Sequence, residues 1–434
     1  MQFFENPSEE IWADILKRPT ASLEALEPQV KAIFKDIEAR GDQALIDYTL
    51  RFDQVQLSAI EIQKESLETL ATQITPELKG AIDQAARNIQ CFHEAQKSSI
   101  VRVETQAGVH CWQEKRPIER VGLYIPGGTA PLFSTLLMLA LPAKIAGCSE
   151  IILCTPPQAD GSIPVEVAYI AETYGVDRVF SLGGVQAIGA MTFGTATVPS
   201  VDKIFGPGNQ YVTVAKQLAT QQQVAIDMPA GPSEVLVMAD DTADPDFVAA
   251  DLLSQAEHGV DSQVILVSTS QALIEATQQA VVNQLSELPR KAIVEKALEN
   301  SKAIFFETDE QAIACINAYG PEHYILVVAQ EEKYLKELKH AGSVFIGNYT
   351  PESAGDYASG TNHTLPTNGY VRQYSGVNLD SFLKAISFQK ISPKGLQDLG
   401  PIIEKMAAAE GLQAHKQAVS LRLAKLQKKQ NESF

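Results

Sequence analysis

Two polar side chains end an otherwise apolar helical pattern in LLSQAEHGVDSQ. Gln255 and His258 are three residues apart, and residues at this spacing share one face of a helix. Asp244 near the start of the segment and Gly259 after it predict a helix between them. Both side chains can therefore bind one object, such as a metal ion. Taken alone, the pair is explained more simply as a helix end whose histidine complements the helix dipole.

Glu322 and His323 in GPEHYIL come immediately before a predicted strand. Imidazole titrates near neutrality, and burial raises the pKa of a carboxyl group toward the same range. An adjacent acid and imidazole therefore suit proton transfer. A surface turn is the alternative explanation of this pair.

A long polar stretch, TPESAGDYASGTNHTLPTNGY, covers residues 350–370. Loops of this length inside compact domains are usually functional or disordered, and Asp356 and His363 favour function here. His415 lies much further along, in a helical tail where Glu410 precedes Gly411. Read locally, His415 is an exposed helix histidine.

The elements that must position these residues follow a strand-turn-helix pattern. From residue 119, β-branched runs that end in turns recur about two dozen residues apart, the spacing of βα units in a parallel sheet. The first series is ERVGLYIPGG, SEIILCTPP, DRVFSLGG and VDKIFGPGN, and the second is SEVLVMAD, SQVILVST, KAIFFET, HYILVVA and GSVFIGN. The chain is therefore predicted to be an α/β protein with two Rossmann-like parallel-sheet domains, one inserted in the other.

Helical periodicity in PELKGAIDQAARNIQCFHEAQ predicts that the region before residue 118 packs helices on the second sheet. We expect an N-terminal helical segment, a discontinuous first Rossmann-like domain, an inserted second one and a helical C-terminal segment. Their predicted bounds are residues 1–20, residues 21–122 with 235–375, residues 123–234, and residues 376–434.

Two glycine-containing turns, in YIPGG and GPGNQY, each follow a strand and open a helix, where exposed N–H groups favour anions. Neither is GxGxxG, because Gly206, Gly208 and Tyr211 occupy the compared positions. The spacing alone leaves a nucleotide site as one option.

Composition excludes several classes of protein. The 434 residues are 45% hydrophobic and 20% charged, which is typical of a folded protein with two domains. The net charge of -18 argues against a nucleic-acid partner. The start, MQFFENPSEE, is not a secretory signal, and five cysteines without a CxxC pair indicate reduced thiols in a cytoplasm. The uncharged segment Val121–Ala143 contains PGG and three prolines, which favours a buried strand, turn and helix over a membrane span.

Seven motifs spanning nearly the whole chain resemble those of the histidinol dehydrogenase family. In order they are VGLYIPGG, IFGPGNQYV, DMPAGPSEVLV, LLSQAEHGVDSQ, GPEH, PESAGDYASGTNHTLPT and AEGLQAHK. The resemblance implies a zinc-dependent enzyme that oxidises L-histidinol through L-histidinal to L-histidine with two NAD, the last steps of histidine biosynthesis.

The resemblance also implies roles for individual residues. The zinc ligands, for one ion per subunit, fall on Gln255, His258, Asp356 and His415. The proton-transfer pair falls on Glu322 and His323. Substrate contacts fall on both of these sets and on Ser233, His363 and Glu410, and NAD contacts fall on Tyr124, Gln186 and Asn209. An amide oxygen is outside the usual set of zinc ligands, so residue types alone do not identify Gln255.

The resemblance further implies an intertwined homodimer in which Glu410 and His415 complete the partner's site. Two other functions are considered. One is a related zinc- and NAD-dependent dehydrogenase of another small polar alcohol, against which His363 and Glu410 weigh. The other is a two-lobed binding protein that holds a small amine without chemistry.

Overall fold

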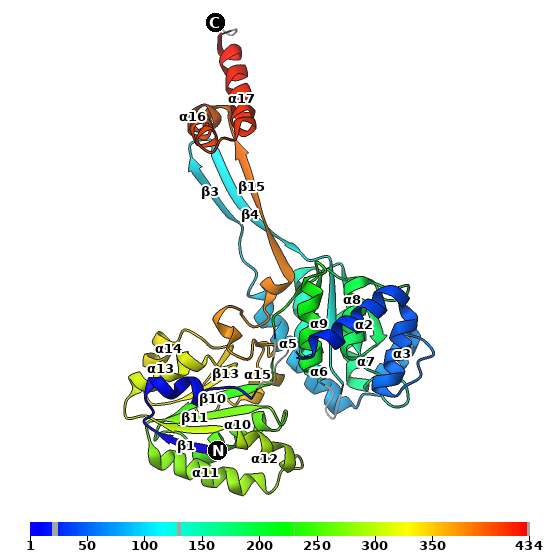
Figure 1. The fold of residues 1–434 in the computed structure, drawn as a ribbon, viewed down its shortest axis with the longest axis vertical. Coiled ribbons are helices and arrows are strands. Elements are labelled where there is room, and N and C mark those ends of the chain that lie inside the picture. The colour runs from blue at the N-terminus through cyan, green and yellow to red at the C-terminus, as the bar shows by residue number, and fades with distance from the viewer. Residues whose placement is uncertain (20–24, 128–131, 230, 432–434) are drawn as a thin grey trace. The chain divides into compact units, whose positions relative to one another are not determined.

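The computed structural model describes residues 1–19, 25–127, 132–229 and 231–431 (Figure 1). The chain forms two compact units. The first consists of Met1–Gln96 and Ile118–Phe382, and the second of Lys97–Pro117 and the chain from Leu383 onward.

The first unit contains a six-stranded sheet in the order β2-β7-β6-β5-β8-β9. Its strands are parallel except for the antiparallel pair β2 and β7. They are β2 (Glu61–Ile62), β5 (Arg120–Tyr124), β6 (Glu150–Thr155), β7 (Arg178–Ser181), β8 (Lys203–Phe205) and β9 (Ala225–Ile226). The helices that follow its strands are α6 (Phe133–Ala146), α7 (Val165–Tyr174), α8 (Gly184–Phe193) and α9 (Gln210–Thr220).

A second six-stranded sheet in the same unit, fully parallel, has the order β1-β12-β11-β10-β13-β14. Its strands are β1 (Gln2–Glu5), β10 (Glu234–Ala239), β11 (Gln263–Ser268), β12 (Lys302–Phe305), β13 (His323–Val327) and β14 (Ser343–Ile346). Its helices are α1 (Trp12–Ile15), α10 (Pro245–Ala256), α11 (Gln271–Leu285), α12 (Lys291–Glu299), α13 (Asp309–Tyr319), α14 (Glu331–Glu337) and α15 (Glu352–Tyr357). Single 3-10 turns are η1 (Glu9–Ile11), η3 (Tyr370–Arg372) and η4 (Leu379–Phe382).

The nine predicted strands are all present, and the predicted α/β class is confirmed. Apart from the edge strands β2 and β1, which come earlier in the chain, each sheet is built from a central strand, β5 or β10, outward to one side and then from the centre to the other side. This reversal is the doubly wound arrangement of Rossmann-like domains. The last residue of the turn predicted at YIPGG, Gly128, lies outside the described residues.

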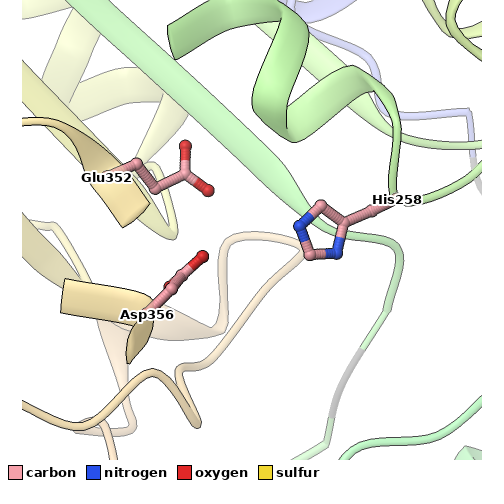
Figure 2. Close-up of side chains that lie close together, drawn as sticks. All are labelled: His258, Glu352 and Asp356. Carbon is pink, nitrogen blue, oxygen red and sulfur yellow. The ribbon is translucent and has the colours of Figure 1, made fainter. Parts of the chain in front are cut away.

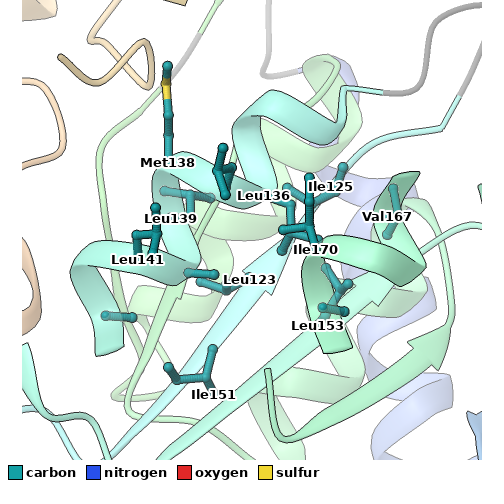
Figure 3. Close-up of a cluster of buried hydrophobic side chains, with 14 of the residues drawn as sticks. Leu123, Ile125, Leu136, Met138, Leu139, Leu141, Ile151, Leu153, Val167 and Ile170 are labelled. Carbon is teal, nitrogen blue, oxygen red and sulfur yellow. The ribbon is translucent and has the colours of Figure 1, made fainter. Parts of the chain in front are cut away.

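Apolar clusters cover both faces of each sheet. Helix α6 is buried over the whole of Ser134–Ala143, which explains its uninterrupted apolar sequence, and Figure 3 shows its leucines packed against β5 and β6. Across the described residues, every helix is too short or too polar to span a membrane.

The prediction that the region before residue 118 packs on the second sheet is wrong for its helices. These are α2 (Glu27–Arg40), α3 (Asp42–Asp53), α4 (Lys64–Ala71) and α5 (Pro76–Glu94). They contact α6, α7, α8 and α9 on the first-described sheet, and β2 pairs with β7 of that sheet. Helical periodicity identifies which face of a helix is buried, but not which sheet that face contacts.

Two terminal segments also differ from prediction. The segment expected to be helical at residues 1–20 begins with β1, which extends the second-described sheet by pairing with β12. The C-terminal segment expected to be helical at residues 376–434 contains β15 (Leu383–Ile391). In the second unit β15 pairs antiparallel with β4 (Val109–Pro117), which pairs with β3 (Val101–Gln106). Helices α16 (Pro393–Ala409) and α17 (Gln413–Asn431) complete that unit and pack on each other.

Candidate active site

Polar side chains from separate elements gather at the amino ends of β10 and β13. Helix α10 starts at its N-cap Asp244, as predicted, and runs back antiparallel to β10, so its last turn returns to the amino ends of the strands. This places the buried Gln255 beside His323, the first residue of β13, with Gln255 Nε2 3.5 Å from His323 Nδ1. Each βα crossover thus brings residues distant in sequence to one site.

A cluster of metal-ligating groups lies at this site. The ligand atoms of His258, Glu352 and Asp356 lie within 4.8 Å of one another, and Figure 2 shows these side chains converging from the end of α10 and from α15. The adjacent Gln255 Oε1 is buried without a hydrogen-bond partner, a state that is costly unless another group binds it. Glu352 Oε2 is likewise buried without a partner, and an oxygen and imidazole donor set with two such oxygens fits a divalent cation such as zinc.

Glu352 was missed by the sequence analysis. It is four residues before Asp356 on α15, so both carboxylates share one helix face. Its side chain is 1% exposed, and Oε1 lies 3.7 Å from His323 Nδ1. Burial raises the pKa of Glu352 to about 8. The residue lies in a polar stretch that reads as a loop, and the one available signal was its spacing from Asp356.

The two nitrogens of His323 have different surroundings. Nδ1 lies 3.2 Å from the carbonyl oxygen of Glu234, and since a carbonyl can only accept, Nδ1 carries the proton and donates it. Nε2 is buried without a hydrogen-bond partner, 3.6 Å from a carboxylate oxygen of Asp356. Burial alone would lower the pKa of His323, but the carboxylates of Glu352, Glu322 and Asp356 raise it well above its ordinary value. Because Nδ1 donates to the backbone, Nε2 is the nitrogen through which the ring can exchange a proton.

Glu322 is held by the same backbone. Its Oε2 accepts a hydrogen bond of 2.9 Å from the N–H of Glu234. The side chain is 5% exposed, and burial raises its pKa to about 8. A carboxyl group that titrates near neutrality can act as a general base or acid.

Glu234 is in turn held by a buried ion pair that sequence reasoning did not find. Its carboxylate pairs with Arg18, which also donates to the carbonyl oxygens of Tyr319 and Gly320, at 3.0 Å and 3.2 Å, where the GPEH turn begins. The guanidinium lies 4.0 Å from the centre of the Tyr319 ring. Arg18 and Glu234 are 216 residues apart in sequence, so no local pattern relates them.

His363 lines the same cavity, of about 500 Å³, as Ser233, His258 and Glu322. Its Nδ1 donates to the backbone oxygen of Asp356 at 2.9 Å, and its Nε2 accepts from the hydroxyl of Thr135 at 2.8 Å. Burial lowers the pKa of His363, which favours this neutral form.

A neighbouring cavity of about 640 Å³ is lined by all three predicted NAD contacts, Tyr124, Gln186 and Asn209. It lies where β5 and β8 end and α8 and α9 begin, the position at which doubly wound sheets bind nucleotides. The Tyr124 hydroxyl accepts from the N–H of Gly184 at 3.0 Å, and burial raises the tyrosine pKa to about 12. The hydroxyl proton therefore stays in place and is free for donation to a ligand.

Comparison with known proteins gives the family. A family model described as histidinol dehydrogenase matches residues 16–423. The chain is 55% identical over 423 residues to the histidinol dehydrogenase of Bacteroides thetaiotaomicron, covering 98% of this chain and 99% of that protein. It is 52% identical over 428 residues to that of Bacteroides fragilis, covering 99% and 100%.

The chain belongs to the histidinol dehydrogenase family. It is therefore an oxidoreductase, and the resemblance recognised in its motifs is confirmed. The crystal structure of histidinol dehydrogenase from Elizabethkingia anophelis is 55% identical, covers 98% of this chain and 99% of its own, and superposes with a TM-score of 0.96.

The residues that the histidinol dehydrogenase motifs single out divide between the two units. Within the first unit, the structure brings together Ser233, Gln255, His258, Glu322, His323, Asp356 and His363 at one site and Tyr124, Gln186 and Asn209 at the neighbouring cavity. Glu410, the C-cap of α16, and His415, in the first turn of α17, belong to the second unit and are exposed there.

Proposed function

We propose that this chain oxidises L-histidinol through L-histidinal to L-histidine with bound zinc and two NAD used in succession. The observation that supports this most directly is geometric: a buried His323 Nε2 without a hydrogen-bond partner, the adjacent buried carboxyl of Glu322, and a metal-ligand cluster lie at one site. Buried acid and imidazole groups with perturbed pKa values favour an enzyme over a binding protein without chemistry. Membership of the family supports histidinol as the alcohol over other small polar alcohols.

The proposed zinc ligands are Gln255, His258 and Asp356, with His415 as the fourth. A zinc ion held by these residues would supply a Lewis acid to which the imidazole and the amine of histidinol could bind, so that the carbinol carbon is oriented. Glu352 lies within the same cluster and offers a further carboxylate oxygen beside the proposed ligands. His363 and Ser233 line the rest of the substrate cavity.

His323 acts first in this scheme. Its Nε2 takes the carbinol proton, while the Nδ1–H bond to the Glu234 carbonyl fixes the ring and its tautomer. The Arg18–Glu234 pair holds that strand end in place, so it positions His323 without touching the substrate.

Glu322 acts in the second oxidation. As a general base it removes a proton from the water that adds to the aldehyde, which the first oxidation leaves bound in the cavity. The N–H of Glu234 keeps one carboxylate oxygen in position. Retention of the aldehyde between the two oxidations limits escape of a reactive intermediate.

The cofactor is proposed to lie in the cavity of Tyr124, Gln186 and Asn209, with phosphates toward the N-terminus of α9. This cavity shares Pro126, Asn209 and Tyr211 with the substrate cavity. We expect the nicotinamide ring to lie beside these shared residues, next to the carbinol carbon of the substrate.

A homodimer is proposed to complete the site. In the described part of the second unit, Val109 and Ala407 are the only buried hydrophobic residues. Nine larger hydrophobic side chains there are exposed: Ile100, Val101, Val103, Ile386, Ile391, Ile402, Met406, Leu412 and Leu421. An exposed apolar surface of this kind is typical of a protein–protein interface, and we propose that a second copy of the chain binds there. Glu410 and His415 of one subunit would then complete the active site of the other subunit. We place the enzyme in the cytoplasm, consistent with its free cysteines.

The shared site predicts complementation between two inactive variants. His258→Asn and His415→Asn chains are unfolded together and refolded as a mixture. A mixed dimer then has one site with both changes and one with neither, so random pairing should return roughly a quarter of wild-type activity. A mixture that contains verified mixed dimers and remains inactive would reject the shared site.

The function itself is tested by following NADH formation with L-histidinol and zinc. We expect NADH formation to depend on L-histidinol, and 2-aminobutan-1-ol, an amino alcohol without the imidazole, to react at least about 100-fold more slowly because it loses one of two anchoring groups. Equal rates with both alcohols would favour the related dehydrogenase of a smaller alcohol. Binding of histidinol without NADH would favour the binding protein.

A further inference from the structure

The proposed cofactor cavity contains an acidic side chain that neither the family motifs nor the proposed mechanism uses. Asp53 is the last residue of α3 and lines the cavity with Tyr124 and Gln186. Among the described residues that line this cavity, Asp53 is the only charged one. Whatever binds beside Asp53 therefore meets a negative charge with no lysine, arginine or histidine to offset it.

The carboxylate is held at the cavity wall by one side-chain contact. Gln186 donates from Nε2 to Asp53 Oδ2 at 3.2 Å. The other oxygen, Oδ1, faces Gly183 at the start of α8, where even a Cβ atom would lie only 3.3 Å away. Burial raises the pKa of Asp53 to about 6, so the group is still largely charged at neutral pH and has capacity to accept further hydrogen bonds.

The position of Asp53 indicates which end of the dinucleotide it meets. The wall shared with the catalytic cavity consists of Pro126, Asn209 and Tyr211, and Asp53 is not part of it. The nicotinamide must reach the catalytic cavity through that shared wall. Asp53 therefore lies toward the other half of the cofactor, the adenosine.

We propose that Asp53 selects NAD over NADP by accepting hydrogen bonds from the hydroxyls of the adenosine ribose. This rests on the proposed use of a nicotinamide dinucleotide at this cavity. In NADP the 2′-hydroxyl of the adenosine ribose is esterified by a phosphate, so the carboxylate loses a donor and faces a second negative charge. Asp53 is thus a residue that determines cofactor specificity and takes no part in proton transfer.

Binding of cofactor fragments tests this without relying on catalysis. The dissociation constants of 5′-AMP and 2′,5′-ADP, which differ by the 2′-phosphate, are measured by calorimetry on the full-length zinc-loaded protein. We expect wild type to bind 2′,5′-ADP at least about tenfold more weakly than 5′-AMP, and Asp53→Asn to reduce that ratio by about tenfold or more. Asp47→Asn, an exposed carboxylate on the same helix paired with Arg40, is the matched control and should keep the wild-type ratio.

The kinetic counterpart compares kcat/KM for NAD and NADP with L-histidinol. Asp53→Asn should raise the KM for NAD and lower that for NADP while kcat with NAD changes less than about threefold, because Asp53 lies outside the catalytic cavity. Equal binding of the two fragments by wild type, or an unchanged ratio in Asp53→Asn, would overturn the proposal. Asp53→Ser gives the same test if the asparagine variant unfolds. Selective fragment binding without histidinol oxidation would instead count against the proposed function alone.

Discussion

His258→Asn is expected to remove bound zinc and to lower the rate of histidinol oxidation by at least about 100-fold. This is a larger decrease than the substitution of a residue that only contacts a metal ligand would cause. Imidazole is the strongest ligand that this chain's first unit offers to the cluster, and asparagine cannot replace it. Gln255→Ala should release less metal, because an amide oxygen is a weaker ligand. Metal content measured by atomic emission beside the rate of NADH formation checks both parts of the prediction.

His340→Asn is the matched control for this experiment, since His340 lies outside the metal cluster and both cavities. It should keep about one zinc per subunit and the wild-type rate. Treatment of wild type with a chelator should abolish oxidation, and added zinc should restore it. Full activity in protein verified to be free of metal would contradict the role of the cluster.

Glu322→Gln is expected to separate the two oxidations. The glutamine keeps an oxygen that can accept from the N–H of Glu234, but it cannot remove a proton from water. Oxidation of supplied histidinal to histidine should therefore fall by about 10²–10⁴-fold. Reduction of histidinal to histidinol with NADH, which needs no activated water, should stay within about tenfold of wild type.

His323→Asn should slow both directions, because Nε2 exchanges the carbinol proton in each. The exposed Glu287→Gln is the control for loss of a carboxylate elsewhere in the chain and should leave both reactions unchanged. Equal losses of both half-reactions in Glu322→Gln would mean that Glu322 does not act specifically on water.

Local patterns predicted most of the fold. Each of the nine strands is a short run, rich in β-branched residues, that is bounded by turn residues. Such a buried strand can be recognised from its own local sequence. Which sheet receives the helices α2 to α5 depends instead on long-range packing, and that prediction failed. Strand β15 lacks strict alternation of polar and apolar residues, and most of its residues are exposed, so its sequence pattern does not distinguish it from a helix.

The sequence predicted those site residues that lie in recognisable motifs. It did not predict the residues whose surroundings are created only when the chain folds. Glu352 reads as a solvated acid until α15 packs it beside His323. Arg18 and Glu234 read as ordinary surface charges, since nothing local links an N-terminal arginine to the start of β10. These three groups belong to the site because the fold buries them and brings together residues that are distant in sequence. Their residue types alone do not indicate this.

The ratio of NADH formed to L-histidinol consumed tests the central claim most directly, because a single site that carries both oxidations must reduce two NAD for each substrate. Zinc-loaded protein is mixed with a limiting, known amount of L-histidinol and excess NAD, NADH is measured by absorbance, and the products are separated by chromatography. We expect two NADH for each histidinol, with L-histidine as the product and no accumulated histidinal. One NADH for each histidinol with histidinal left in solution, or no NADH at all, would contradict this claim.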